Sequence, residues 1–469
     1  MIFSLENAED EITIAKKFPF VKLSLSFEEL KIPQKNLKIG VIGFGPAGMF
    51  AALTLAENGF KPVVFERGCN IDTRKRDVDL FCGGGTFNPE SNIQFGEGGA
   101  GTFSDGKLTT RINDNFTGFV LHKFAQFGAP PEILNKARPH IGTDNLCEII
   151  KNIRKAIISL GGEVRFNTKI TGIENANGGV RLTFDNETEN FDRVILAAGH
   201  SAKDIFTLLK EQTPMEHKPF SVGVRIEHRR VDINRSLYGE NPGLPEGEYM
   251  LSKHIGGRGV YTFCMCPGGM VMPSNSEPET VVTNGMSEFG RNGDNSNAAV
   301  CVSVNPEDFD NSDLFGGLKF IEIIEKSAYR HDLPYCAPGT SVGGFIDGKP
   351  TLDGLSVTGT YPRGLYESDF TGIFPEFVIT HLKQGLKAFS NKLSAYGDMN
   401  ALLTAPETRT SSPLRIKRNE NGEAYGIKGL FPCGEGAGYA GGIMSAAVDG
   451  LRCAMWATHG CPLSKKENI

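Results

Sequence analysis

The chain lacks the features that mark membrane, secreted and nucleic-acid-binding proteins. No run of 18 apolar residues occurs among its 469 residues, so no membrane-spanning helix is expected. The first residues carry acids where a signal peptide would carry basic and apolar regions. Ten cysteines without a CxxC pair form no disulfide framework, which favours free thiols in a cytoplasmic protein. The net charge of −6, without a long Lys/Arg run, argues against nucleic acid as the main partner.

Glycine is the residue type in clear excess. Its 57 occurrences in 469 residues are about 12%, against about 7% in an average protein. They follow no collagen period and form no Gly/Ser linker, so the excess indicates backbone that turns tightly or approaches a ligand closely. The length exceeds what one hydrophobic core supports, so two or three structural regions are expected.

A strand–turn–helix–strand unit lies near the N-terminus. LKIGVIG is typical of a buried parallel strand, GFGPAG at 43–48 forms the turn, and PVVFER predicts a second strand. Gly43 permits the tight turn, Gly45 lets the backbone approach a pyrophosphate, and Gly48 permits close helix–strand packing. Glu66, 18 residues after the last glycine, is placed to accept two hydrogen bonds from ribose hydroxyls. The unit predicts a bound dinucleotide.

Two later segments separate FAD from NAD. VILAAGH at 194–200 is a buried strand ending in small residues, and GLFPCGEGAGYAGGIMSAAVDG at 429–450 predicts a strand, two glycine turns and a helix start. With the first unit they resemble the glutathione-reductase-like FAD superfamily. The segments FGEGGAGTFSDGKL, YTFCMCPGG, VVTNGMS, ETRTSSPLRI and LFPCGEGAGYAGGIMSAA resemble a bacterial family of uncharacterised FAD-dependent dehydrogenases, over about 37–460. The resemblance implies FAD as cofactor and indicates no substrate.

The resemblance also implies which residues contact FAD. The N–H groups of Gly442, Ile443 and Met444, at a helix N-terminus, are expected to stabilise negative charge on the reduced flavin. Glu435 is expected to contact the ribityl chain or the pyrophosphate, where the superfamily more often has Asp. The expected cofactor-binding residues are Gly43, Gly45, Pro46, Ala47, Gly48, Glu66, Arg67, Arg74, Gly98, Gly99, Gly101, Thr102, Ala198, Gly199, Gly434, Glu435, Gly441, Gly442, Ile443 and Met444.

The stretch 94–107 is expected to pass the isoalloxazine ring, with Ser104, Asp105 and Lys107 at the edge of the ring. A solvent-exposed loop is the alternative interpretation. Two arginines follow the second strand, Arg74 and Arg76, and they are expected either to neutralise the pyrophosphate or to be solvated surface charges.

Candidates for catalysis are few. Cys264 and Cys266 alternate in YTFCMCPGG, so both thiols are expected on one side of a strand. They are interpreted either as active-site thiols facing the flavin or as packed, unreactive side chains. His254, Arg258 and His200 are acid–base candidates, and no second cysteine pair at zinc spacing completes a metal site. A disulfide reductase mechanism is disfavoured because CxxC is absent, and a separate NAD(P)H domain because a second GxGxxG unit is absent.

The expected fold is α/β, a glutathione-reductase-like, Rossmann-like FAD-binding domain with an inserted α+β substrate domain. The expected divisions are a short leader (1–36), the first part of the FAD-binding domain (37–214), the inserted substrate or cap domain (215–400), the C-terminal part of the FAD-binding domain (401–460) and a tail (461–469). Strand-like alternation is found at 21–25, an antiparallel meander is expected at 169–184, and helices are expected at 144–160, 318–328 and 376–396.

The expected function is hydride or electron transfer between bound FAD and a small organic substrate, with NAD(P)H or a protein as electron donor. Neither nucleic acid nor membrane is expected as a partner. Two alternatives stay open at this point. One is a non-enzymatic flavin-binding electron relay that docks a redox partner. The other is an FAD-dependent RNA-modifying enzyme, which the absence of a basic stretch disfavours.

Overall fold

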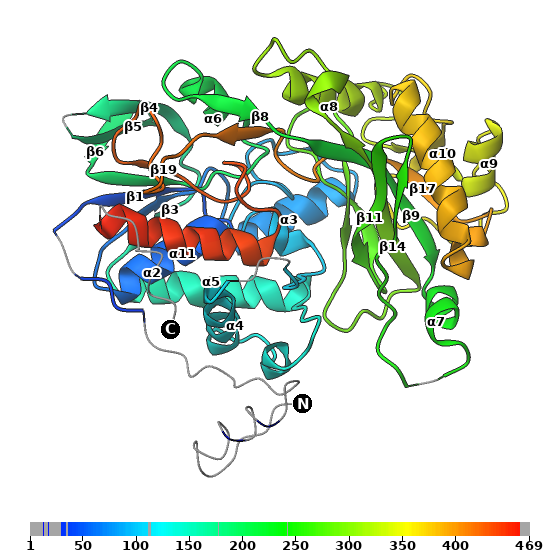
Figure 1. Ribbon diagram of the computed structural model, residues 1–469, viewed down its shortest axis with the longest axis horizontal. Coiled ribbons are helices and arrows are strands. Elements are labelled where there is room, and N and C mark those ends of the chain that lie inside the picture. The colour runs from blue at the N-terminus through cyan, green and yellow to red at the C-terminus, as the bar shows by residue number, and fades with distance from the viewer. Residues whose placement is uncertain are drawn as a thin grey trace.

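Two sheet-based regions lie side by side in the computed structural model (Figure 1). The structure describes residues 13, 17, 30–33, 36–110, 114–176, 178–241 and 243–459. The alternation noted at 21–25 and the tail at 461–469 lie outside the described residues. Within the described part, no helix combines the length and the apolar character that a bilayer crossing requires.

The first region is built on a five-stranded parallel sheet. Its strand order is β19 (Leu430–Pro432), β7 (Arg193–Leu196), β1 (Ile39–Ile42), β2 (Val63–Phe65) and β3 (Glu163–Arg165). All four residues of β1 are buried, as expected for a parallel strand covered on both faces. The helices of this region are α2 (Pro46–Glu57), α3 (Ile71–Cys82), α4 (Phe116–Gln126), α5 (Thr143–Ser159), α6 (Lys203–Leu209) and α11 (Ile443–His459), with short 3-10 turns η1 (Ala100–Phe103) and η2 (Pro131–Leu134).

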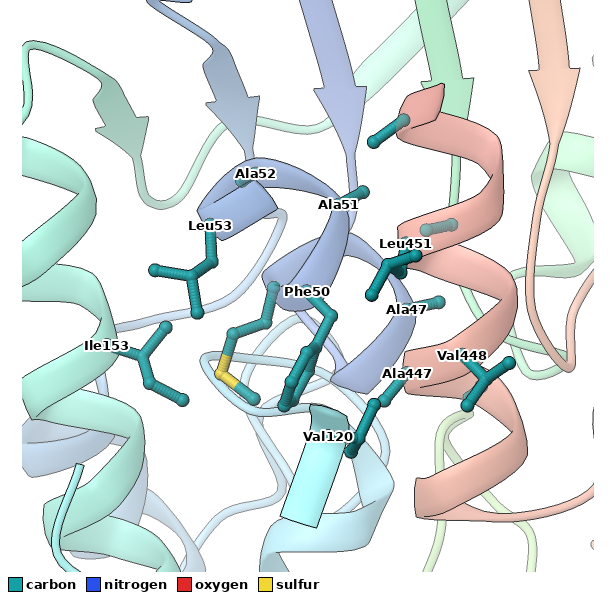
Figure 2. Close-up of a cluster of buried hydrophobic side chains, with 14 of the residues drawn as sticks. Ala47, Phe50, Ala51, Ala52, Leu53, Val120, Ile153, Ala447, Val448 and Leu451 are labelled. Atoms are coloured by element: carbon teal, nitrogen blue, oxygen red, sulfur yellow. The ribbon is translucent and has the colours of Figure 1, made fainter. Parts of the chain in front are cut away.

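Small side chains let α2 and α11 pack closely against each other. Figure 2 shows Ala47 and Phe50 of α2 near Ala447 and Leu451 of α11 in a buried apolar cluster. A Cβ added to Gly450 would lie 2.0 Å from the carbonyl oxygen of Ala47, so this crossing requires glycine. The opposite face of the sheet is covered by a meander of β4 (Ile170–Ala176), β5 (Gly179–Phe184) and β6 (Glu187–Phe191). The expected meander is confirmed and has a third strand.

The second region is built on a seven-stranded, mostly antiparallel sheet. Its order is β10 (Ser252–Ile255), β11 (Arg258–Cys266), β14 (Asn295–Val304), β9 (Phe220–Arg229), β17 (Leu402–Glu407), β15 (Ala337–Ser341) and β16 (Leu365–Glu367). A hairpin of β12 (Met270–Pro273) and β13 (Thr283–Met286) packs on it. Around it lie α7 (Arg230–Tyr238), α8 (Gly316–Ser327), α9 (Val342–Asp347), α10 (Glu376–Ser390), η3 (Pro306–Asp308) and η4 (Ser394–Gly397).

One antiparallel pair of strands carries the chain between the regions. The chain leaves through β8 (Met215–His217) and returns through β18 (Leu414–Ile416), which pairs with β8. β17 pairs with β9 and β15, so the second region includes its residues. The division expected at 400/401 therefore falls before a central strand of this sheet. The strands that pair with β17 lie far from it in the sequence, so the sequence around 400 does not show to which region β17 belongs.

The helices expected at 144–160 and 318–328 are present as α5 and α8. The helix expected at 376–396 is shorter. It ends at Ser390, and the 3-10 turn η4 follows.

Candidate functional site

A cavity of about 1370 Å³ lies between the two regions. It exceeds the ~300–1,000 Å³ of an ordinary small-molecule pocket. One wall is formed by the residues that follow β1, β7 and β19, at the carboxyl ends of parallel strands, and the other includes 248–254 and 259–265 of the second region. Ligands of open α/β sheets bind at this edge, where neighbouring strands diverge.

The turn at 43–48 forms part of the cavity wall. Gly43 has φ +94°, and a Cβ added to it would lie 2.4 Å from the carbonyl oxygen of Ala197. Gly45 is the N-cap of α2 and Pro46 its first residue. A Cβ added to Gly48 would lie 1.9 Å from the Gly43 carbonyl oxygen, so Gly48 packs against the turn and does not line the cavity. The free N–H groups and partial positive charge of the helix N-terminus favour a phosphate here.

Glu66 holds this turn in place. Its Oε2 accepts from the Phe44 N–H at 2.8 Å, and its Oε1 accepts from the N–H groups of Gly68 and Gly96 at 2.9 and 3.0 Å. A carboxylate has about four acceptor sites, so about one remains for a ribose hydroxyl rather than the two expected. Glu66 still lines the cavity, as does Arg67.

Arg67 is fixed by two carboxylates and an aromatic ring. It donates to Glu90 at 2.7 Å and to Asp204 at 2.9 Å, and its guanidinium lies 4.2 Å from the ring centroid of Phe95. The pKa of Arg67 is raised, because hydrogen bonds and attraction from these carboxylates outweigh desolvation, which is the largest single influence and lowers the pKa.

Both interpretations of Arg74 are wrong. Asn70 caps α3 by accepting from the Thr73 N–H at 3.1 Å. Arg74, which follows Thr73 in the first turn of this helix, is fully buried and does not line the cavity. Its guanidinium donates to the carbonyl oxygens of Asn92, Ile93 and Glu97 at 2.8, 2.9 and 2.6 Å. Arg74 therefore organises the glycine-dense loop. By contrast, Arg76 is exposed, as a solvated charge would be.

The loop 94–107 is largely buried, so the solvent-loop alternative is wrong. Gly99 and Gly101 line the cavity, whereas Gly98 and Thr102 do not. A Cβ added to Gly98 would lie 2.2 Å from the Thr102 Oγ1, so these two residues pack within the loop. Gly434 is likewise absent from the lining. Its N–H donates to Asp449 at 2.8 Å.

The glycines just before α11 and the first residues of that helix form another part of the cavity wall. Gly441, Gly442, Ile443 and Met444 line the cavity, and a Cβ added to Gly441 or Gly442 would meet no atom within 4 Å. The same open space faces Gly199, which lines the cavity beside Ala198. The glycines thus leave a bare backbone surface, and the helix N-terminus offers amides to a partial negative charge. Both features fit a flat ring that takes up negative charge.

Three ionisable groups meet beside this surface. Burial raises the pKa of Glu435 to about 7, although Lys218 opposes the rise. Burial, with repulsion from Arg409 and Lys218, lowers the pKa of His200 to about 3. The His200 Nδ1 lies 3.6 Å from the Glu435 Oε1, and a neutral histidine makes this contact polar rather than ionic. Among the described residues, the buried Nε2 of His200 has no hydrogen-bond partner, as befits a group that a bound ligand or water satisfies.

A second charged cluster lines the far end of the loop. Buried Asp105 accepts from Arg291 at 2.9 and 2.6 Å and also contacts Lys107 and Ser287. Arg291 continues to Glu248 at 2.6 Å. Desolvation opposes ionisation of Asp105, but Lys107 and Arg291 hold its pKa below the usual range. Arg291 and Glu248 were not singled out in the sequence, because both lie in irregular segments without a motif.

Only some of the candidates for catalysis line the cavity. Cys264 lines the cavity, while Cys266 is buried and does not. The expected regular alternation is interrupted by a bulge between Phe263 and Cys266. His254 is exposed and reaches the cavity, whereas Arg258 is held by Asp308 and absent from the lining.

One group of metal-type ligands exists in the described part of the chain. Ligand atoms of Cys433, Asp449 and Cys453 lie within 4.8 Å of one another. Arg418 donates to both carboxylate oxygens of Asp449 at 3.0 and 2.7 Å. A guanidinium therefore already neutralises the only carboxylate of the group.

Two sequence families match the chain. Residues 219–410 match the family described as FAD-dependent protein, C-terminal domain-like, and residues 93–219 match flavin containing amine oxidoreductase. Together with a cavity whose residues fit the cofactor, they define an FAD-dependent oxidoreductase with a mixed α/β fold. The chain is 43% identical over 447 residues to an uncharacterised protein of Clostridium beijerinckii, covering 92% of this chain and 84% of that one. It belongs to the same family as that protein.

Solved structures with a similar arrangement are distant. CtdE in complex with FAD is 12% identical, with 89% of this chain and 83% of that chain covered and a TM-score of 0.33. NikD, an unusual amino acid oxidase essential for nikkomycin biosynthesis, is 12% identical, with 91% and 95% covered and a TM-score of 0.40. The tetracycline destructase Tet(51) is 12% identical, with 88% and 79% covered and a TM-score of 0.35.

Proposed function

We propose that the protein transfers hydride or electrons between FAD and a small organic molecule, using a glutathione-reductase-like, Rossmann-like FAD domain with an inserted substrate domain. The observation that carries this proposal is a single cavity that joins the turn at 43–48 to the first turn of α11. A dinucleotide bound in this cavity would have its pyrophosphate against the N-terminus of α2 and its ring against the N-terminus of α11. The cavity also has room beyond an ordinary ligand pocket for a second molecule.

The residues present divide the work between binding and chemistry. The N-terminus of α2 binds the pyrophosphate, and Glu66 holds the turn in the conformation that exposes those amides. Bound FAD supplies the capacity to accept and donate an electron pair. The first turn of α11 offers N–H groups to the negative charge that reduction creates. Glu435 can hold a proton beside this turn, because its pKa is about 7. His200, whose pKa is about 3, is neutral there.

The substrate side is the wall formed by the second region. Tyr249, Tyr261 and Thr262 line it together with Cys264 and His254. Aromatic, hydroxyl and thiol groups together suit a small organic molecule with both apolar and polar parts. The partners we propose are this substrate and an electron donor, NAD(P)H or a protein, with no nucleic acid.

The test is anaerobic mixing of the purified protein with NADH, NADPH and a panel of small organic reductants and oxidants, followed by the visible flavin absorbance. We expect at least one donor to bleach the flavin and one acceptor to restore it. Bleaching only by a stoichiometric protein partner would favour the relay alternative instead. Salt-sensitive RNA binding would favour the RNA-modifying alternative.

A further inference from the structure

Strand β11 changes conformation where it reaches the cavity. Cys264 has φ +42°, a left-handed value that a non-glycine residue rarely adopts. The pairing of β11 with β14 shifts register between Phe263 and Cys266, which is a β-bulge. Bulges bend a strand and re-aim a side chain, and they occur often beside active sites. Here the bulge places Cys264 in the cavity wall.

A buried ion pair fixes this conformation. Arg225 of β9 is fully buried and donates from Nη1 to the carbonyl oxygen of Cys264 at 2.8 Å. The same guanidinium donates to Glu407 of β17 from Nε at 2.8 Å and from Nη2 at 3.0 Å. A strained residue persists only where its surroundings over-determine it. The Arg225–Glu407 pair provides that support, across two neighbouring strands.

The second cysteine sits directly behind the first. A Cβ added to Gly285 would lie 2.8 Å from the Cys266 sulfur, so this glycine leaves the space that the sulfur occupies. The Cys266 sulfur lies 3.4 Å from the Cys264 carbonyl oxygen, and its S–H also reaches the Cys264 sulfur. The contact with Cys264 and burial both raise the pKa of Cys266, so the deeper thiol keeps its proton.

The charges around Cys264 favour its anion. Donation by the Cys266 S–H, with attraction from Arg225 and Lys107, lowers the pKa of Cys264 against desolvation and repulsion from Asp105. The pKa of Cys266 is raised by the same contact and by burial. The groups that face Cys264 are Cys266 of β11, Arg225 of β9, Glu407 of β17, Cys301 of β14, and Lys107 and Asp105 of the loop 94–107. Low thiol pKa, a cationic setting and access to a cavity together mark reactive cysteines.

We propose that Cys264 is the nucleophile of this cavity, taking electron-poor carbons of conjugated carbonyl compounds, and that Cys266 is its positioning residue. The proposal rests on the proposed function for the role of the cavity and deepens it by naming a substrate class. An electron pair of the Cys264 thiolate forms a C–S bond at the β-carbon. The C=C electron pair forms a double bond to the carbonyl carbon, and the C=O pair moves onto the oxygen, which gives an enolate. The α-carbon of the enolate then takes a proton from water. No net oxidation or reduction occurs. Lys107 lines the cavity and has three donors, which suit the developing oxyanion.

The test is the rate at which N-ethylmaleimide labels Cys264 in the full chain, followed by peptide mass spectrometry from about pH 4.5 to about pH 9.5. We expect a midpoint well below the ~8.5 of an ordinary thiol. Cys82 is the internal control, because burial and Asp79 raise its pKa to about 11. At pH 6 we expect Cys264 to label at least about tenfold faster than Cys82.

Two variants at Cys266 separate its role from packing. Cys266→Ala removes the donor, whereas Cys266→Ser keeps an O–H donor of similar size. If Cys266→Ala raises the pKa of Cys264 by about two units, the thiolate fraction of Cys264 falls ~100-fold at a pH below the midpoint. The more basic thiolate is ~10-fold more nucleophilic, which offsets part of this loss. Labelling of Cys264 at pH 6 should therefore be about tenfold slower in this variant. Cys266→Ser should shift the midpoint less. Lys107→Met, which leaves the pair intact, should also raise the midpoint.

The inference is overturned if Cys264 labels no faster than Cys82 at pH 6, or if its midpoint near 8.5 is the same in all three variants. Labelling needs neither FAD nor substrate. A protein that exchanges no electrons with any small molecule but labels at low pH therefore retains this inference and loses the proposed function.

Discussion

Replacing Gly441, two residues before α11, by valine tests whether the N-terminus of that helix holds the flavin end of FAD. Gly441 is exposed to the cavity, has no positive φ, and would meet no atom within 4 Å if it carried a Cβ. The protein itself therefore tolerates the side chain, which would occupy space that the cofactor needs. Overpacking costs about 1–3 kcal/mol, so we expect FAD to bind about 5- to 150-fold more weakly.

Gly397→Val is the matched control. Gly397 is also exposed, without positive φ and without neighbours within 4 Å, but it lies in η4, away from the cavity. Flavin fluorescence during titration of the flavin-free protein gives the Kd of each variant, and circular dichroism gives Tm. The expected result is weaker FAD binding in Gly441→Val alone, with the Tm of both flavin-free variants unchanged. Equal FAD affinity in the two variants would refute the placement of the ring at α11.

Three further changes probe stability and protonation. Arg74→Met should lower the free energy of unfolding by about 3 kcal/mol or more, because several buried carbonyls lose their donor, whereas exposed Arg76→Met should change it by less than about 0.5 kcal/mol in urea unfolding. Gly450→Val should lower Tm sharply, since the added carbon meets the Ala47 carbonyl at 2.0 Å. Folding raises the pKa of Glu435 from 4.5 to about 7. Its contribution to stability is thus present below pH 4.5 and lost as pH rises through about 7, by at most about 3 kcal/mol. Glu435→Gln should remove this loss in the flavin-free protein, and a wild-type-like pH profile in that variant would contradict the assignment.

Local patterns in the sequence predicted the β1–α2–β2 unit well. The turn at 43–48 is marked by the spacing of its glycines, of which Gly48 answers a contact within the turn itself, with the Gly43 carbonyl oxygen. The apolar strand, the proline at the helix start and the acid at the second strand's end reinforce one another. The β1–α2–β2 unit can therefore be predicted from its own residues, without knowledge of the rest of the chain.

Contacts between distant segments could not be predicted in the same way. Arg74 was interpreted by its charge, because a fully buried arginine is rare and its acceptors are backbone carbonyls that have no sequence signature. The bulge at Cys264 depends on Arg225 and Glu407, which lie on strands far from it in sequence. Regular alternation was the only local signal available for Cys264 and Cys266, and it did not predict the bulge that leaves only Cys264 in the cavity wall.

The parallel sheet has a consequence for biogenesis. β7 lies between β1 and β19, and residues 197–429 separate Leu196 from Leu430 in the chain. At roughly 5–20 residues per second, the ribosome needs about 10–50 s to synthesise that interval. During this time one edge of β7 has no partner strand, and α11 does not yet lie beside the turn at 43–48. Because β19 and α11 follow the second region in the chain, the proposed FAD site cannot be complete before that region has been synthesised.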